Sequence, residues 1–249
     1  MDHRVSNRIF ILLIVTLSVA AAAGVFLPQN TSSVPMPTAE LPASRPVLAL
    51  ANAGIVLVVY GALGWIGLLL SRRLGLPEIW DAAVTNRQRF LIPLLAGFGA
   101  GALIILGDAA FSPINGIGHF PHPPFPTSIV ASLAAGIGEE VLFRLFFISF
   151  WTWLVSRVLL RGRWQMQVFW FFGVLSAIAF GLSHLPSVMF LMGWTSLSQV
   201  PAMLIIELIL LNGVMSIFAA YYFRKYGFLA PVGIHFWADI LWHVIWGLV

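Results

Sequence analysis

The chain has 249 residues, of which 60% are hydrophobic and 9% are charged, with a formal net charge of +4. Soluble domains carry roughly 25% charged residues, so this composition excludes a water-soluble fold and makes lipid the solvent for most of the surface. The absence of cysteine excludes disulfides and thiolate–metal sites. The basic residues lie in short clusters between apolar runs, which does not indicate a nucleic-acid surface.

Apolar runs long enough to cross a bilayer recur along the chain and predict an all-α, polytopic transmembrane bundle of about seven spans. The predicted spans are 9–27, 47–70, 90–108, 128–154, 167–187, 199–223 and 228–248. A helical, re-entrant segment at 188–198 would make eight. Residues 9–27 resemble a cleaved secretory signal in having small residues near their end, but the run exceeds the usual core of about 7–15 residues, so a retained span is preferred.

The basic residues predict the orientation of these spans. If every span crosses, eleven of the 13 Arg and Lys residues fall on one side of the membrane. They are Arg4, Arg8, Arg72, Arg73, Arg87, Arg89, Arg157, Arg161, Arg163, Arg224 and Lys225. Arg45 falls on the other side, and Arg144 lies within a span. The positive-inside rule therefore predicts a cytoplasmic N-terminus in a multi-pass protein of the membrane, and we expect the bacterial cytoplasmic membrane.

Two outer segments, 28–46 and 109–127, are rich in proline and are predicted to be irregular. The second contains His119 and His122, but two histidines in such a loop are usually solvated, so no metal site is expected there. Glycines within the second and third spans are predicted to let neighbouring helices pack closely in lipid. These are Gly61, Gly64, Gly67, Gly97 and Gly101.

Charged residues cluster in the fourth span, where each costs at least about 2.5 kcal/mol unless it has a partner or a purpose. Glu140 and Arg144 are four residues apart, on one helical face and in the order that pairs well. Glu139 is rotated by about 100° and is not matched to the arginine by that spacing. We expect Glu140 to be neutralised structurally and Glu139 to remain available as a general base. In the alternative interpretation both carboxylates pair with the one arginine in a buried contact that is purely structural. Two acids and one base are poorly suited to such a contact, because their charges do not balance.

The fifth span places Phe180 and His184 on one helical face, so that the phenyl ring can pack beside the imidazole. Counted from the predicted boundaries, Glu139 lies about 17 Å below the outer edge. His184 falls near that edge, and His235 lies nearer the cytoplasm. The three side chains can reach a common depth only if helices tilt or break, or if the predicted boundaries shift. The adjustment is expected at Gly136, Gly138 and Gly181.

The last span carries a polar stripe, because His235, Asp239 and His243 recur every four residues. Such a stripe indicates either a seam that hydrogen-bonds to a neighbouring helix or the lining of a wet cavity. Glu207 in the sixth span is a further acid without an assigned function, and we expect one of these histidines to be its partner.

In this order on successive spans, Glu-Glu-x-x-x-Arg, Phe-x-x-x-His and His-x-x-x-Asp resemble the CPBP family. Its members include type II CAAX prenyl endopeptidases and bacteriocin-processing or Abi-type proteins. The similarity covers roughly residues 125–246. It implies a glutamate-dependent intramembrane protease that needs no metal or other cofactor and acts on a peptide or protein at the membrane. The catalytic helical core would be residues 125–249, and residues 1–124 would add N-terminal helices and proline-rich outer loops.

The resemblance also implies functions for single residues. Glu139 would activate a water molecule with the help of His184, while His235 and Asp239 would bind the developing oxyanion. Supporting residues would be Glu140, Arg144 and Phe180. The family pattern accepts Asn or Asp at position 239, but an ionised Asp cannot donate a hydrogen bond. Asp239 is then either protonated, or it orients and charges His235, which donates instead, and we expect the second arrangement.

Three other functions fit parts of the pattern. A zinc protease would use Glu139, His184 and His235, with Asp239 or His243, although the chain lacks His-Glu-x-x-His. A non-catalytic immunity or scaffold protein would keep the polar cluster to bind a peptide or partner. A proton-coupled transporter is less favoured, since the chain has few spans and no evident internal repeat.

Overall fold

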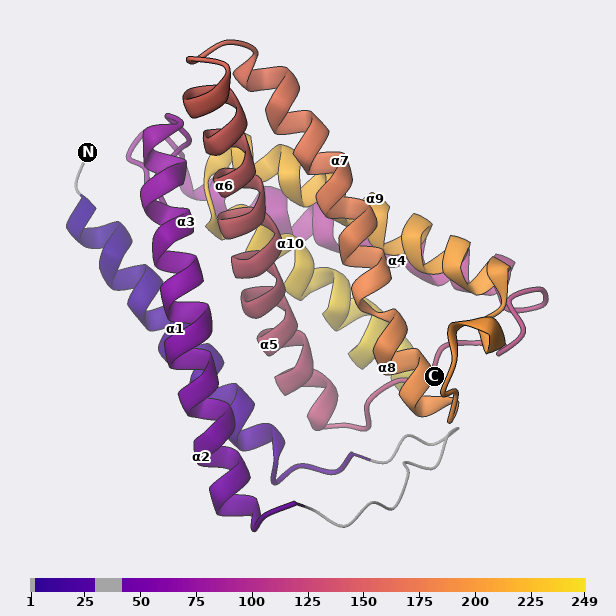
Figure 1. The fold of residues 1–249 in the computed structure, drawn as a ribbon. Coiled ribbons are helices and arrows are strands. Elements are labelled where there is room, and N and C mark those ends of the chain that lie inside the picture. The colour runs from indigo at the N-terminus through magenta and orange to yellow at the C-terminus, as the bar shows by residue number, and fades with distance from the viewer. Residues whose placement is uncertain (1–2, 30–41) are drawn as a thin grey trace.

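The computed structural model describes residues 3–29 and 42–249. All regular secondary structure in these residues is helical, and turns and loops connect the helices. Seven helical rods of this described part pack into one bundle (Figure 1). The first three are α1 (His3–Gly24), α2–η1–α3 (Arg45–Ile55, Val56–Tyr60, Gly61–Arg73) and η2–α4 (Arg87–Leu91, Ile92–Phe111). The fourth and fifth are α5–η3–α6–η4 (Thr127–Glu140, Val141–Ile148, Ser149–Thr152, Trp153–Leu159) and α7–α8 (Gln165–Ser183, Leu185–Leu191). After the short turn η5 (Leu197–Gln199) come α9 (Ala202–Tyr226) and α10–η6–η7 (Leu229–Asp239, Ile240–Ile245, Trp246–Leu248).

The rods confirm the predicted helical membrane bundle. Five of them are long and apolar enough to cross a membrane by length and composition. The other two begin at α5 and α10, and they carry the Glu-Glu-x-x-x-Arg and His-x-x-x-Asp elements that lower their apolar character. Residues 188–198 do not form an eighth rod, because α8 continues α7 and then gives way to turns. Residues 30–41 of the first proline-rich segment lie outside the described residues.

Helix α10 lies at the centre of the bundle, in contact with α4, α5 and α9. Its approach to α4 is close because α4 presents Gly97 and Gly101. A Cβ atom on Gly97 would lie 2.6 Å from the carbonyl oxygen of Ile234, and one on Gly101 would lie 2.8 Å from that of Ala238. The predicted close packing at these two glycines is confirmed, and it fixes the depth of the helix that carries His235. Gly61 differs, since a Cβ there would meet only an ordinary side-chain contact at 3.8 Å.

One end of the bundle, here called the basic end, contains the start of α1 and the loops 74–86, 160–164 and 227–228. The opposite end contains the loops 112–126 and 192–201 and the C-terminus (Figure 1). All eleven basic residues that the sequence assigns to one side lie at or beside the basic end. The positions of the loops therefore agree with the predicted alternation of the spans.

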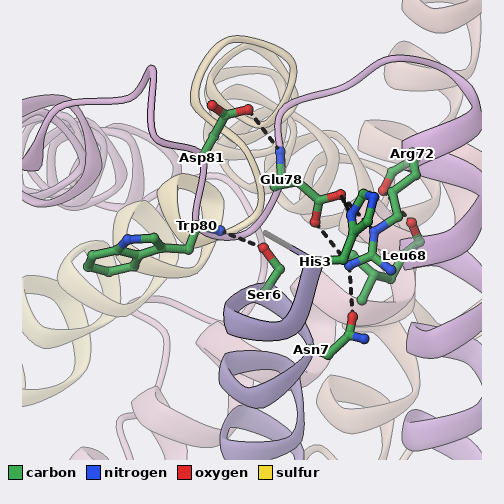
Figure 2. A network of polar contacts seen from close by, with 9 residues as sticks. His3, Ser6, Asn7, Leu68, Arg72, Glu78, Trp80 and Asp81 are labelled. Carbon is green, nitrogen blue, oxygen red and sulfur yellow. Dashed lines mark hydrogen bonds and ion pairs between the residues drawn. The ribbon is translucent and has the colours of Figure 1, made fainter. Parts of the chain in front are cut away.

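A polar network ties α1 to α3 and to the loop 74–86 at the basic end (Figure 2). Arg72 donates from Nε to Oε1 of Glu78 at 2.7 Å and from Nη2 to Oε2 at 3.0 Å. The same Nη2 donates to Asn7 of α1 at 2.7 Å. His3 donates to Oε1 of Glu78 at 2.8 Å, and the backbone N–H of Trp80 donates to a serine of α1 at 3.1 Å. The network thus fixes the N-terminal helix against the second rod.

Candidate active site

The Glu-Glu-x-x-x-Arg element lies where α5 changes into the π-helical η3, directly after Glu140. Glu140 and Arg144 are fully buried, and Nη1 of the arginine lies 3.1 Å from Oε1 of the glutamate. The guanidinium lies over the ring of Phe180, 4.7 Å from its centroid. The predicted pairing of these two charges is confirmed. Within the described part of the chain, none of the Arg144 nitrogens has a hydrogen-bond partner.

His235 joins this buried pair to the neighbouring carboxylates. Its Nδ1 donates to Oε1 of Glu140 at 2.9 Å. Its Nε2 therefore faces the other two acids, at 3.8 Å from Oε2 of Glu139 and 3.6 Å from Oδ2 of Asp239. The hydrogen bond that orients this ring thus comes from Glu140, and the contact with Asp239 is an ion-pair distance at the opposite nitrogen.

His184 is fixed at the end of α7 by the residue one turn before it. Its Nδ1 donates to the carbonyl oxygen of Phe180 at 2.9 Å. The two rings pack edge to face with centroids 5.0 Å apart, which confirms the contact predicted from their spacing. The same phenyl ring packs edge to face on His235 at 5.6 Å. One aromatic residue therefore packs against both imidazoles, and Nε2 of His184 remains available for other contacts.

Four of the predicted site residues line a single cavity of about 420 Å³: Glu139, His184, His235 and Asp239. The side chain of Glu139 is 34% exposed, whereas that of Glu140 is fully buried. Oε2 of Glu139 has no hydrogen-bond partner among the described residues. The two adjacent glutamates are thus separated as their spacing predicts, one held in the core by an arginine and the other facing the cavity.

Close helix packing and π-helical segments lie where the mismatch in depth was expected to be adjusted, and the fifth rod changes from α7 to α8 at His184. A Cβ on Gly136 would lie 3.1 Å from the backbone nitrogen of Phe236, so α5 and α10 approach each other directly beside the site. The π-helical segments begin one residue after Glu140 and one residue after Asp239. Such segments interrupt α-helices at functional positions in many proteins.

The loop 112–126 closes part of the cavity through contacts that the sequence analysis missed. Asn115 is fully buried and donates from Nδ2 to Oε2 of Glu207 at 2.7 Å. The partner of Glu207 is therefore this loop asparagine, and the prediction of a histidine partner from the last span was wrong. A loop side chain deep in a bundle needs a buried acceptor, and Asn115 preceding a Gly-rich turn was the only signal for it.

The two loop histidines are also engaged with the helices. His119 pairs with the buried carboxylate of Asp108, and Nδ1 of His122 lies 3.2 Å from Nδ1 of His243. Burial lowers the pKa of His122, against the opposing charge of Asp108, so this ring is neutral near pH 7. The expectation of simple solvation was therefore wrong for His122, whereas His119 pairs with Asp108 but is still 64% exposed. Across the described residues, no group of three or more His, Cys, Asp or Glu side chains is placed to hold a metal ion.

Comparison with known proteins places the site in a family. Residues 121–241, just under half of the chain, match the family model described as type II CAAX prenyl endopeptidase Rce1-like. None of the curated proteins and none of the solved structures matches the chain. The matched segment contains all four cavity-lining residues of the predicted site, and the match does not address the Abi-type branch of the resemblance. The segment 121–241 therefore belongs to the Rce1-like family of type II CAAX prenyl endopeptidases, which are membrane proteases.

Proposed function

We propose that this protein is an intramembrane endopeptidase in which Glu139 activates the water that attacks a peptide carbonyl. The observation that supports this best is the placement of Glu139, His184, His235 and Asp239 around one cavity of about 420 Å³. The paired charges of Glu140 and the arginine behind it lie in the dry core. We propose residues 125–249 as the catalytic core and the first 124 residues as supporting helices and loops.

The geometry suggests a function for each group. The Glu139 side chain lines the cavity and is 34% exposed, as a general base must be to take a proton from water. Its Oε2, which has no hydrogen bond among the described residues, is buried and faces His235. His184 uses its Nδ1 proton on a backbone carbonyl, so Nε2 of the neutral ring is left to accept a hydrogen bond from that water. The proton that Glu139 takes from the water is then the one returned to the leaving amine.

His235 is suited to stabilise the oxyanion. Its Nδ1 proton is used on Glu140, so its Nε2 proton is the one available to a developing negative charge in the cavity. Asp239, at 3.6 Å from this nitrogen, favours the protonated imidazole. In this proposal Asp239 acts by charging His235, and the ring itself donates to the oxyanion.

The proposal is tested by comparing the termini of membrane proteins in cells that carry wild type or Glu139→Gln at equal abundance. New termini in wild-type cells should disappear in the variant, because loss of a general base costs about 10²–10⁴ in rate. Glu78→Gln is the matched control, since it removes a buried carboxylate at the other end of the molecule and should leave the termini unchanged. Identical profiles for wild type and folded Glu139→Gln would replace proteolysis by a binding or immunity function.

A second arm separates this mechanism from a zinc protease. Once a cleaved protein has been identified, the purified enzyme should cut it at the same rate with and without a strong chelator. Loss of cleavage in the chelator, restored by added zinc, would favour the zinc protease instead.

A further inference from the structure

The cavity and the basic residues lie at different ends of the bundle. The cavity extends from Glu139 and His235 to Phe120 of the loop 112–126 and to Met192 at the end of α8. Both of these limiting residues belong to the opposite end of the bundle, where the C-terminus also lies (Figure 1). The eleven clustered Arg and Lys residues lie at or beside the basic end. Basic loops remain in the cytoplasm when a membrane protein inserts.

Toward the basic end, the cavity is closed by a packed layer. On four of the lining helices, α5, α7, α9 and α10 with their continuations, a residue within about one turn of the site on this side is fully buried. These residues are Val141 and Arg144 after Glu139, Phe180 before His184, Ala219 after Met215, and Ile234 before His235, each with an exposed fraction of 0%. Interiors packed in this way leave no path for a peptide. A polypeptide approaching from the basic end would therefore meet the core before it met Glu139.

Toward the opposite end, the lining is apolar apart from Ser187, Asn212 and the polar groups already described. It includes Val188 and Leu191 of α8 and Leu208 and Leu211 of α9. Ser187 of α8 lies on the same wall and is exposed. Apolar walls with a few convergent polar groups are typical of sites that bind apolar ligands in a fixed orientation. An apolar peptide segment fits such a lining.

We infer that the active-site cavity opens to the non-cytoplasmic side of the membrane. Its substrate is then an apolar peptide segment in the outer half of the bilayer or just outside it, such as part of an exported or membrane-anchored polypeptide. A C-terminus presented from the cytoplasm, prenylated or not, does not reach the site. This inference rests on the proposed proteolytic function for the nature of its ligand, but the direction of the opening can be tested without any substrate.

The chain has no cysteine, so single cysteines can be introduced into it without any other change. Ser187→Cys and Ala135→Cys report on the cavity. Leu197→Cys, at a position 66% exposed in the loop 192–201, reports on the opposite end. Arg163→Cys, in an exposed turn, reports on the basic end. Each variant is treated with a membrane-impermeant sulfonated maleimide, in right-side-out spheroplasts and in inverted membrane vesicles.

The cavity cysteines and Leu197→Cys should be modified several-fold faster in spheroplasts, and Arg163→Cys several-fold faster in inverted vesicles. If the cavity cysteines are instead modified faster in inverted vesicles, as is expected for Arg163→Cys, the inference is overturned. Cavity cysteines that react from neither side, while reacting after denaturation, would overturn it as well.

The labelling needs no turnover, so its outcome is independent of proteolysis. If the cavity cysteines are labelled from the non-cytoplasmic side but the protein termini do not depend on Glu139, the orientation of the cavity is supported and the proposed function is wrong. Labelling from the basic side together with Glu139-dependent termini in cytoplasmic segments would overturn the orientation and keep the protease. With both correct, the Glu139-dependent termini should map to non-cytoplasmic segments of their proteins.

Discussion

The molecule contains two clusters in which a buried glutamate meets an arginine and a histidine, and they differ in how well the charges are satisfied. At the basic end, Glu78 accepts hydrogen bonds from both nitrogens of the Arg72 fork and from His3 (Figure 2). Inside the bundle, Glu140 accepts a hydrogen bond from His235, while the ion pair with its arginine includes no hydrogen bond among the described residues. We call the first cluster, Arg72, Glu78 and His3, the closed cluster, because its ion pair is hydrogen-bonded. We call the second, Arg144 and His235 with the three acids around them, the open cluster, because its ion pair, within the described part of the chain, is not.

The difference lies in the number of acids. In the first cluster one carboxylate is neutralised by its cation, and desolvation, which alone would raise the pKa of Glu78, is outweighed by the hydrogen bonds and charge of Arg72. In the second, Glu139 and Asp239 both lie within 4 Å of a histidine that already serves Glu140. A Glu–Arg pair alone is therefore a structural feature, and the surplus of acids around it is what indicates a functional site.

The largest effect is expected for Arg144→Met, which tests the open cluster. Removing the cation leaves Glu140 fully buried with only a histidine as partner, and breaking a buried pair in this way costs about 3–5 kcal/mol. The variant should unfold at a clearly lower temperature in detergent and should lose proteolysis. A loss of stability smaller than that of the corresponding change in the closed cluster would contradict the assignment of Arg144 to the architecture of the site.

Arg72→Met makes that corresponding change at the basic end. The arginine is 16% exposed and two of its three hydrogen bonds go to a charged carboxylate, so their loss should cost about 2 kcal/mol. Thermal unfolding measures the effect, and the Glu139-dependent termini should persist. Arg73→Met, next to it in sequence and exposed, is the matched control and should change stability by less than about 0.5 kcal/mol. An equal loss in both variants would mean that the network contributes nothing specific.

The sequence was sufficient to predict the bundle and the ion pair inside the second cluster. Apolar runs located all seven rods, and the four-residue spacing identified the pair of Glu140 and Arg144. The second partners could not be found in this way, because they come from far along the chain. His235 lies 95 residues from Glu140, and Asn115 lies 92 residues from Glu207. No periodicity within a single helix contains that information.

The relative depth of the site residues was the other limit. A regular rise of about 1.5 Å per residue placed Glu139, His184 and His235 at different heights. The structure instead contains π-helical segments beside Glu140 and Asp239 and a close contact at Gly136, which bring the side chains to one cavity. Small shifts of this kind follow from the packing of two helices and have no signature in either one alone.

Acid should weaken the closed cluster. The folded-state pKa of Glu78 lies below its ordinary value of 4.5, so the stability that it contributes is fully present above that pH and is lost as the pH falls through the folded pKa. The difference in unfolding temperature between wild type and Arg72→Met should therefore be wide at pH 7 and should narrow below about pH 4.5. A difference that stays constant down to pH 3 would show that the carboxylate charge is not what Arg72 stabilises.

The smallest effect on stability is expected for Glu139→Gln, the variant with the largest expected effect on activity. Glu139 is a third acid beside Asp239 and Glu140, it is 34% exposed, and one of its oxygens makes no hydrogen bond among the described residues. Removing its charge relieves repulsion and breaks no described hydrogen bond, so the unfolding free energy should change by less than about 1 kcal/mol or should rise. Thermal unfolding of wild type, Glu139→Gln and Glu140→Gln under one condition measures this. Glu140→Gln should be clearly destabilised, because it removes the charge that pairs with Arg144 and weakens the hydrogen bond from His235. If the two glutamine variants lose the same stability, Glu139 is as structural as its neighbour, and a surplus of acids would no longer distinguish the functional cluster from the closed one.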